Sequence, residues 1–418
     1  MRIPKSIKKV IRNYAKTHPG FRRWARNTKA AYKKWEFDRG RKNIAIEDKL
    51  VYFNSFVGRS YGDSPKAIYE YMLKSPEFSD YKFVWMFRHP ENYEWLLENR
   101  DTRIVTFGSA GERDALRRAK YWITNYRMMD RYVPNDEQVY VQCWHGTPLK
   151  RLGYDLTSSD NAMNDLSEIR EKYEKDAARF KYMVSPSAFV TEKYISAWNL
   201  EEYGKADCII EEGYPRNDRL KNATEDDIRA IKDGLQVPED KKIILYAPTW
   251  RDNQHKASVG YTYNLAVDFD KLREYLGEKY VILFRAHYLV ASEFDFGKYS
   301  GFVWDVSKYD DINDLYLASD MLVTDYSSVM FDYANLRRPV IFYMYDLEEY
   351  RDNLRGFYFD IKELPGPIVT TEEELKDAIL AIPEDFRPEE KYIEFCNKYN
   401  YLDDGHATER VVTRIFQK

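Results

Sequence analysis

Cysteine is scarce in this sequence: only Cys143, Cys208 and Cys396 occur among its 418 residues. They lie far apart, their number is odd, and no two of them form a Cys-x-x-Cys pair. We therefore expect neither a disulfide framework nor a cysteine-based zinc site, and this usage fits a reducing compartment. The sequence shows no other dedicated metal cluster, so we expect no metal site and no bound cofactor.

Long apolar runs are also missing. No stretch approaches the roughly 18 apolar residues that a membrane-spanning helix needs. The start, MRIPKSIKKVIRNYAKTHPGF, lacks the uninterrupted apolar core of a secretory signal, so we expect an intracellular protein. Hydrophobic residues make up 44% and charged residues 32%, an ordinary globular balance. At roughly 150 residues per domain, the length predicts two domains.

The small net charge of −4 conceals a strong asymmetry. Residues 1–42 carry 15 Lys and Arg against two acidic residues, a net charge of +13. The remainder, 43–418, carries 50 basic and 67 acidic residues, a net charge of −17. One end of the chain is therefore suited to an anionic surface.

The apolar residues of this basic segment fall at helical spacing on either side of His18-Pro19-Gly20. The first group is Ile3, Ile7, Val10, Ile11 and Tyr14, and the second is Phe21, Trp24, Tyr32 and Trp35. Basic amphipathic helices with aromatic residues are typical of membrane-surface elements, so we predict peripheral attachment to the cytoplasmic face of a membrane through residues 1–42. Nucleic acid would attract the same charges but is not the expected partner. The other alternative is a segment that is merely solvated or that packs on the acidic body.

From Leu50 onward, short apolar runs alternate with amphipathic stretches, a pattern that predicts parallel sheets covered by helices. Two such series predict an α/β fold with two doubly wound Rossmann-like domains facing across a cleft. We place an N-terminal domain at 43–206 and a C-terminal domain at 207–418. In open parallel sheets, ligands bind beyond the carboxyl ends of the strands. Polar residues directly after the apolar runs are therefore the candidates for a site.

Two apolar runs end in histidine. VYVQCWHGTP (139–148) places His145 beside a Gly turn, where a neutral imidazole could take a proton from a hydroxyl at pH 7. A buried structural histidine is the alternative. KYVILFRAHY (279–288) brings Arg285 and His287 to the same side of a strand, where they could bind an anionic ligand or form a surface ion pair.

Two further runs end in polar residues. In MLVTDYSSVMFDYANLRRPVIFY (321–343), Ser327 and Ser328 stand where a helix begins, so that they could bind an anion or serve as ordinary N-caps. Asp332 follows on this helix and could reach a ribose hydroxyl or lie at the surface. IILYAPTWRDN (243–253) ends in aromatic, guanidinium and amide groups that suit a nucleotide or a polyol, although other polar loops look similar. P-loop, His-Glu-x-x-His, EF-hand and Gly-x-Ser-x-Gly patterns are absent from the sequence.

Taken in order, seven segments resemble the CDP-glycerol glycerophosphotransferase family, which makes teichoic acid and related alditol-phosphate polymers in bacteria. They are CWHGTPLKRLG, GYPRNDRL, YAPTWRDN, FRAH, TDYSSVMFDYANLRRPVIFY, RGFYFD and DDGHATER. The match covers roughly 140–410. The resemblance implies a glycosyltransferase-B type fold with an N-terminal acceptor domain, a C-terminal CDP-alditol domain, and last helices that cross back to the first domain.

The resemblance also implies roles for single residues. His145 would be the base that deprotonates the acceptor hydroxyl, with Gly146, Thr147 and Lys150 on the acceptor side. His287 would contact the donor diphosphate. The donor site would also include Arg216, Thr249, Arg251, Arg285, Asp325, Ser327, Ser328 and Asp332. Trp250 and Tyr288 depart from the common Phe and Pro of the family and could alter donor selectivity.

The implied reaction transfers glycerol phosphate or ribitol phosphate from a CDP-alditol to a hydroxyl of a lipid-linked acceptor, releasing CMP, in teichoic acid or capsule synthesis. Phosphoryl transfer needs mainly positioning and charge stabilisation, which a base and cationic donors can supply. The nearest rival is a nucleotide-sugar glycosyltransferase or epimerase of the same architecture. A membrane- or nucleic-acid-binding protein that has lost catalysis is the rival from another class.

Overall fold

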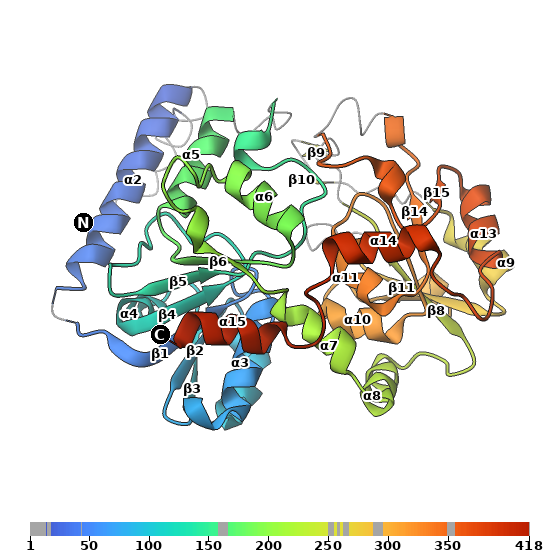
Figure 1. Cartoon of the computed structure of the whole chain (residues 1–418), viewed down its shortest axis with the longest axis horizontal. Helices are drawn as coiled ribbons and strands as arrows, with labels where there is room; N and C mark the ends of the chain where they lie inside the picture. The colour runs from blue at the N-terminus through green and yellow to red at the C-terminus, as the bar shows by residue number, and fades with distance from the viewer. Residues whose placement is uncertain are drawn as a thin grey trace.

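The computed structural model describes residues 14, 18–42, 44–157, 166–249, 255–256, 260–261, 267–286, 296–348 and 356–417. Two lobes lie side by side, each built around a parallel sheet (Figure 1). This arrangement confirms the predicted fold class of two doubly wound α/β domains. The apolar runs form the strands because they are buried on both faces, as parallel sheets covered by helices require.

The first sheet has seven strands in the order β3-β2-β1-β4-β5-β6-β7. They are β1 (Glu47–Asn54), β2 (Lys82–Phe87), β3 (Thr102–Thr106), β4 (Ala119–Thr124), β5 (Val139–Gln142), β6 (Tyr182–Ser185) and β7 (Ile209–Glu211). Its main helices are α3 (Asp63–Lys74), α4 (Ala110–Arg118), α5 (Leu166–Ala177) and α6 (Ala188–Ala197). Between β2 and β3 the chain forms a 3₁₀ helix, Pro90–Glu98, with non-helical backbone at Tyr93.

The second sheet has six strands in the order β12-β11-β8-β13-β14-β15. They are β8 (Lys242–Ala247), β11 (Tyr280–Phe284), β12 (Val303–Asp305), β13 (Met321–Thr324), β14 (Val340–Tyr343) and β15 (Ile368–Val369). Helices α8 (Glu225–Leu235), α9 (Phe269–Leu276), α10 (Ile312–Ala318), α11 (Val329–Tyr333), α13 (Glu372–Leu380) and α14 (Glu390–Tyr399) belong to this lobe. Strands β9 (His255–Lys256) and β10 (Gly260–Tyr261) form a separate antiparallel pair.

The predicted domain boundary at 206/207 is wrong by a few residues. Strand β7 pairs in parallel with β6, from Met183↔Ile209 to Ser185↔Glu211, and so completes the first sheet. The apolar run at 208–213 resembles the start of a new series because periodicity identifies a strand without identifying its neighbour. The first lobe therefore extends to Glu211, and the crossing to the second lobe begins after it.

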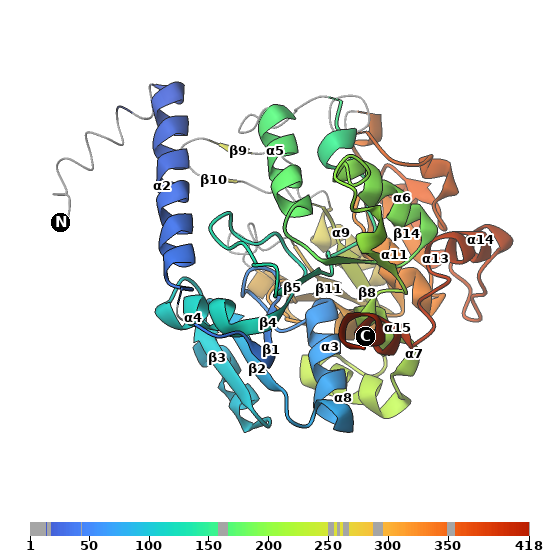
Figure 2. The same cartoon turned by 60° about the vertical axis from the view of Figure 1, so that its left-hand side comes forward.

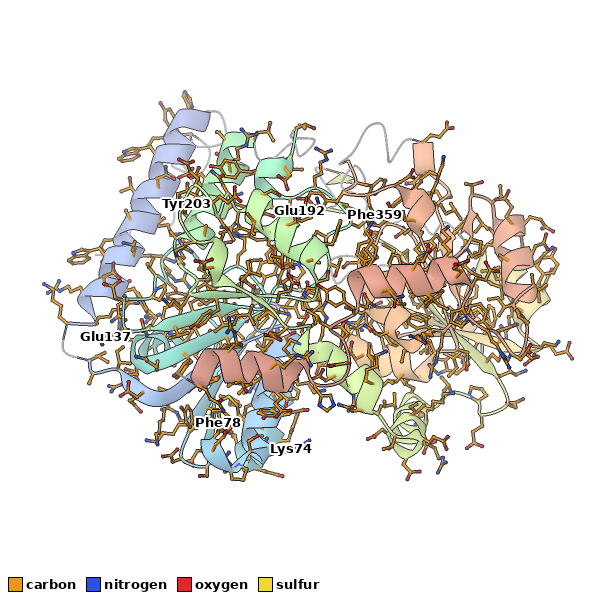
Figure 3. The ribbon with its side chains drawn as sticks, in the orientation of Figure 1. Lys74, Phe78, Glu137, Glu192, Tyr203 and Phe359 are labelled. Atoms are coloured by element: carbon orange, nitrogen blue, oxygen red, sulfur yellow. The ribbon has the colours of Figure 1, made fainter. Side chains whose placement is uncertain are left out.

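The chain crosses between the lobes a second time near its C-terminus. Helix α15 (Ala407–Phe416) follows α14 but packs on α3 of the first lobe. Val411, Val412 and Ile415 join the apolar core of the first sheet. Between the lobes, Phe359 lies where the second lobe faces α6 (Figure 3), and its ring centroid is 6.3 Å from that of Phe189.

Helix α2 (Pro19–Arg39) stands at the outer edge of the first lobe (Figure 2). Pro19 lies in its first turn, where a proline is tolerated because the first amide groups of a helix lack partners. Near its C-terminal end, Phe37 is buried against Tyr132, with ring centroids 5.1 Å apart. The first of the two predicted amphipathic helices, with apolar residues from Ile3 to Tyr14, lies outside the described residues except for Tyr14.

Candidate active site

In each sheet, the strand order reverses at one point where ligands of open α/β folds bind. The reversal lies between β1 and β4 in the first sheet and between β8 and β13 in the second. His145 follows β5, which adjoins β4, while Thr249 follows β8 and Asp325 follows β13. The topology therefore brings these three predicted residues to the carboxyl edges where a site is expected.

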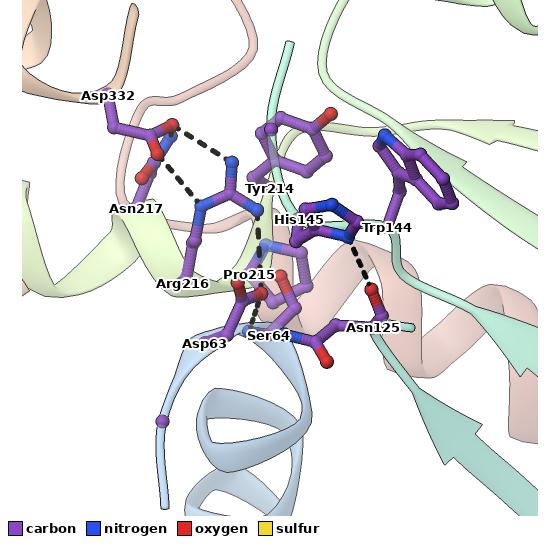
Figure 4. A network of polar contacts seen from close by, with 12 residues as sticks. Asp63, Ser64, Asn125, Trp144, His145, Tyr214, Pro215, Arg216, Asn217 and Asp332 are labelled. Atoms are coloured by element: carbon purple, nitrogen blue, oxygen red, sulfur yellow. Dashed lines mark hydrogen bonds and ion pairs between the residues drawn. The ribbon is translucent and has the colours of Figure 1, made fainter. Parts of the chain in front are cut away.

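His145 has one ring nitrogen fixed by the backbone. Its Nδ1 lies 2.8 Å from the carbonyl oxygen of Asn125, the residue that follows β4 (Figure 4). A carbonyl oxygen can only accept, so Nδ1 carries the hydrogen and Nε2 of the neutral ring is left as a proton acceptor. This is the tautomer that a general base requires.

The surroundings keep His145 neutral. Burial has the largest effect and lowers its pKa, and the positive charge of Arg216 acts in the same direction. The hydrogen bond to Asn125 and the charge of Asp63 act in the opposite direction, but the resulting pKa remains below the ordinary value of 6.5. At pH 7 the imidazole is therefore ready to accept a proton.

Three aromatic rings surround the imidazole. Trp144 is 4.4 Å away between ring centroids, Tyr126 is stacked at 5.6 Å, and Phe56 is edge-on at 6.1 Å. Trp144 has a φ of 49°, a left-handed conformation that is strained for a bulky residue. Its backbone N–H donates a hydrogen bond to Gln142 Oε1. Strain of this kind accumulates at functional sites, where the surrounding structure holds it in place.

On the second lobe, Asp325 organises the turn after β13. Its Oδ1 accepts hydrogen bonds from the Thr249 N–H at 2.7 Å and from the Thr249 hydroxyl, so the two predicted donor-site residues are in contact. Ser327 and Ser328 follow at the start of α11 and are partly exposed. The helix predicted to begin there is short: α11 has five residues and continues as a 3₁₀ turn, so its dipole is small.

The two lobes meet at the site itself. A Cβ placed on Gly146 would lie 2.5 Å from Ser328 Oγ and 3.0 Å from Ser328 Cβ, so only glycine allows this approach. Close by, Lys150 forms an antiparallel bridge with Phe357 of the second lobe. Thr147 is buried in the same loop. Gly146 and Lys150, predicted from the sequence to lie on the acceptor side, thus lie against the second lobe.

Arg216 and Asp332, both predicted to bind the donor, face each other in a buried ion pair (Figure 4). Arg216 Nε and Nη2 donate to the two oxygens of Asp332 at 3.1 and 3.0 Å, and Nη1 donates to Asp63 at 3.4 Å. Asn217 also donates to Asp332, and the Arg216 guanidinium lies 3.9 Å from the centre of the Tyr214 ring. In this arrangement the pair joins the lobes, and its polar groups are occupied by protein partners.

Arg285 likewise has protein partners. Its Nη1 donates to the carbonyl oxygens of Val306 and Tyr309, at 3.2 and 2.8 Å, and so fixes the loop after β12. Nη1 therefore has hydrogen-bond acceptors within the protein and does not need the anionic ligand that was predicted for this side chain. His287, Arg251, Trp250 and Tyr288 lie outside the described residues.

Several residues of the site were not identified from the sequence. Asp63 and Asn125 both contact the network around His145, and Asp403 accepts hydrogen bonds from Tyr214, Asn217 and Asn335. Burial raises the pKa of Asp403 to about 6. Asn125 had a usable signal, because it follows the apolar run YWIT directly. Asp63 had none, because its partner Arg216 is 153 residues away.

Comparison with known families identifies the chain. The sequence profile of CDP-Glycerol:Poly(glycerophosphate) glycerophosphotransferase matches residues 38–417. The chain belongs to this family. Its membership confirms the resemblance drawn from the seven segments and makes the chain an enzyme. Within the described residues, no group of three or more His, Cys, Asp or Glu could hold a metal ion.

Two curated relatives are similar along most of the chain. The teichoic acid glycerol-phosphate transferase of Staphylococcus aureus (strain NCTC 8325 / PS 47) is 43% identical over 88% of this chain and 93% of its own length. The teichoic acid poly(glycerol phosphate) polymerase of Bacillus subtilis (strain 168) is 41% identical over 90% of this chain, which spans only 49% of that relative.

Solved structures agree with this family assignment. The wall teichoic acid polymerase TagF superposes with a TM-score of 0.81 at 34% identity, covering 99% of this chain and 98% of that one. A TagF variant soaked with CDPG gives the same TM-score at 36% identity, covering 94% and 96%. A UDP-N-acetylglucosamine 2-epimerase from Listeria monocytogenes, at a TM-score of 0.50 and 15% identity, covers 88% of this chain and 96% of that one and shares the fold alone.

The protonation of His145 predicts the pH dependence of the enzyme. If His145 is the base, it acts in its neutral form, and because its pKa is lowered the acid limb of kcat/KM should have its midpoint below pH 6.5. Asp63→Asn should move this midpoint lower still, because it removes a charge that favours the imidazolium. Steady-state rates of CMP release between pH 5 and 8 would measure both; a midpoint above 6.5 would contradict the assignment.

The Gly146–Ser328 approach gives a second prediction. Gly146→Ala should push the lobes apart and lower kcat/KM by about 10²-fold, since small misplacements of reacting groups have effects of this size. The double variant Gly146→Ala/Ser328→Ala should retain a higher kcat/KM than the product of the two single effects predicts, because the hydroxyl that the new Cβ would meet is gone. Gly234→Ala is the matched control, because a Cβ there meets no atom within 4 Å. Equal activity of all variants would refute the contact.

Proposed function

We propose that the protein transfers glycerol phosphate from CDP-glycerol to a hydroxyl of a lipid-linked teichoic acid acceptor. The observation that carries the proposal is His145: its Nε2 is free to accept a proton, and the adjoining Gly146 contacts Ser328 of the donor lobe. A base on one lobe and a phosphate-binding turn on the other suit a transfer between two substrates bound in the space they share.

In the proposed reaction, the acceptor hydroxyl oxygen attacks the β-phosphorus of CDP-glycerol. The bond from that phosphorus to the bridging oxygen of the diphosphate breaks, CMP leaves, and a phosphodiester forms. The hydroxyl proton passes to His145 Nε2. Ser327 and Ser328 would donate hydrogen bonds to phosphate oxygens, Thr249 and Asp325 would shape the donor turn, and His287 would contact the diphosphate.

Glycerol is favoured over ribitol as the transferred alditol. The curated relatives named for glycerol phosphate include proteins 43% and 41% identical to this chain. Those named as ribitol-phosphate polymerases are 28 to 31% identical. CDP-ribitol is the second candidate donor, and a capsule polymer is a second candidate product.

Release of CMP from CDP-glycerol and CDP-ribitol, with a lipid-linked saccharide acceptor, tests the reaction. We expect release from CDP-glycerol, and we expect His145→Ala to lower turnover by about 10²–10⁴-fold while donor binding persists. Near-normal turnover of that variant would remove His145 as the base. Release of UMP or UDP from a UDP-sugar, with none from a CDP-alditol, would favour the glycosyltransferase or epimerase alternative.

We further propose that α2 attaches the enzyme to the cytoplasmic face of the membrane. Three of its aromatic residues, Trp24, Tyr32 and Trp35, are 63%, 61% and 52% exposed, while Phe37 on another face packs on the body. Exposed Trp and Tyr favour the interface between lipid and water. No helix among the described residues is long and apolar enough to cross a membrane.

Cations from the body add to the charge beside α2. The pKa of Lys33 is lowered chiefly by the nearby charge of Arg131, and Lys29 and Arg113 act in the same direction. Arg113 belongs to α4 and Arg131 precedes Tyr132, against which α2 packs. Like charges gathered in this way suit the phosphate groups of an anionic leaflet, where each basic residue contributes about 1 kcal/mol.

Vesicle binding tests this attachment. Replacing Trp24, Tyr32 and Trp35 together by Ala should weaken binding to vesicles containing anionic lipid by at least about tenfold, because apolar contact area is lost. Tyr275→Ala with Leu380→Ala, exposed residues of the second lobe, is the matched control. Deleting all of 1–42 is a poorer test, because it removes the buried Phe37. Unchanged binding of the triple variant would refute the role of α2.

A further inference from the structure

Tyr126 differs from the other two rings around His145 in its exposure. It is 40% exposed, whereas Trp144 is 8% exposed and Phe56 is partly buried. Its ring is stacked on the imidazole at 5.6 Å between centroids, with 26° between the planes. A partly solvent-accessible aromatic ring therefore lies directly beside His145.

The backbone around Tyr126 is fixed on both sides. Its carbonyl oxygen accepts hydrogen bonds from Thr124 Oγ1 at 3.0 Å and from Gln142 Nε2 at 3.3 Å. The backbone carbonyl oxygen of the preceding Asn125 accepts the hydrogen bond from His145 Nδ1. The side-chain Oδ1 of Asn125 accepts a second one from the Phe56 backbone N–H, at 2.8 Å. The turn after β4 thus fixes the imidazole and the backbone that carries the tyrosine.

The position of this turn separates it from the donor side. It follows β4 at the point where the order of the first sheet reverses, whereas Thr249 and Asp325 follow the central strands of the second sheet. A group lying on Tyr126 would approach the imidazole from the first lobe. That is the side from which the attacking hydroxyl must come if the donor phosphate occupies the second lobe.

We propose that Tyr126 binds the terminal alditol of the acceptor and positions its attacking hydroxyl at His145 Nε2. This inference rests on the proposed function and names a contact residue of the same site. The C–H groups of a polyol would lie on the apolar ring face, and the phenolic hydroxyl would hydrogen-bond to a neighbouring hydroxyl of the chain. Correct orientation of the nucleophile is itself a large part of catalysis in a two-substrate reaction.

The test separates acceptor binding from donor binding and from the chemistry of the base. With CDP-glycerol at saturation, Tyr126→Ala should raise the acceptor KM by about tenfold, the size of effect expected for a lost aromatic contact. The KM for CDP-glycerol should change less than twofold. Tyr126→Phe keeps the ring and should keep most of the acceptor affinity.

Two controls keep the result interpretable. Tyr203→Ala replaces a tyrosine of the same lobe that is 41% exposed (Figure 3) and is not among the rings around His145, and it should leave both KM values unchanged. The acid limb of kcat for Tyr126→Phe, which keeps the ring on the imidazole, should keep the wild-type midpoint. Unchanged acceptor KM, or a rise confined to the donor KM, would overturn the inference.

Failure of the inference can be told from failure of the proposed function. If wild type releases CMP from CDP-glycerol but Tyr126→Ala matches it at every acceptor concentration, only the role of Tyr126 is refuted. If wild type releases no CMP from either CDP-alditol, the proposed function itself fails. Should Tyr126→Ala not fold, Tyr126→Leu retains apolar volume, and the same KM comparison applies to it.

Discussion

The structure depends most on the buried charge of Arg216. An arginine that is 4% exposed must have compensating partners, because an unpaired guanidinium removed from water is strongly destabilising. Asp332 supplies one partner from the second lobe and Asp63 supplies another from the first. Only when the lobes are together are both carboxylates in place. The charge of Arg216 is therefore compensated only while the two lobes are in contact. The charges of Arg216 and Asp63 also act on the pKa of His145.

The sequence predicted the fold well because its strands are short, strongly apolar runs separated by amphipathic helices. It predicted His145, Thr249 and Asp325 at strand ends, where the structure has them. It failed where the outcome depends on which segments become neighbours. Strand β7 was assigned to the wrong sheet because its partner β6 is chosen by packing, and periodicity carries no information about that choice.

The same reason explains the residues whose surroundings differ from expectation. Arg216 and Asp332 are chemically suited to a nucleotide, but they are 116 residues apart and satisfy each other. A carboxylate near an arginine cannot be recognised from one sequence when the contact is tertiary. Tyr126 was similarly hidden, because a tyrosine after a strand becomes informative only once its ring is seen on the imidazole.

The two crossings between the lobes have a mechanical consequence. The first runs from β7 to α7 (Asp218–Asn222) and the second from α14 to α15, and they are bonded to each other. Asn217 donates to Asp403 at 2.7 Å, and Asp218 accepts from the N–H groups of Ala407 and Thr408. Two chain segments joined in this way resist sliding and twisting of one lobe against the other. Rotation about the axis through them is the relative motion that these bonds restrain least, so lobes that separate by it would return to the same alignment of His145 and Ser328.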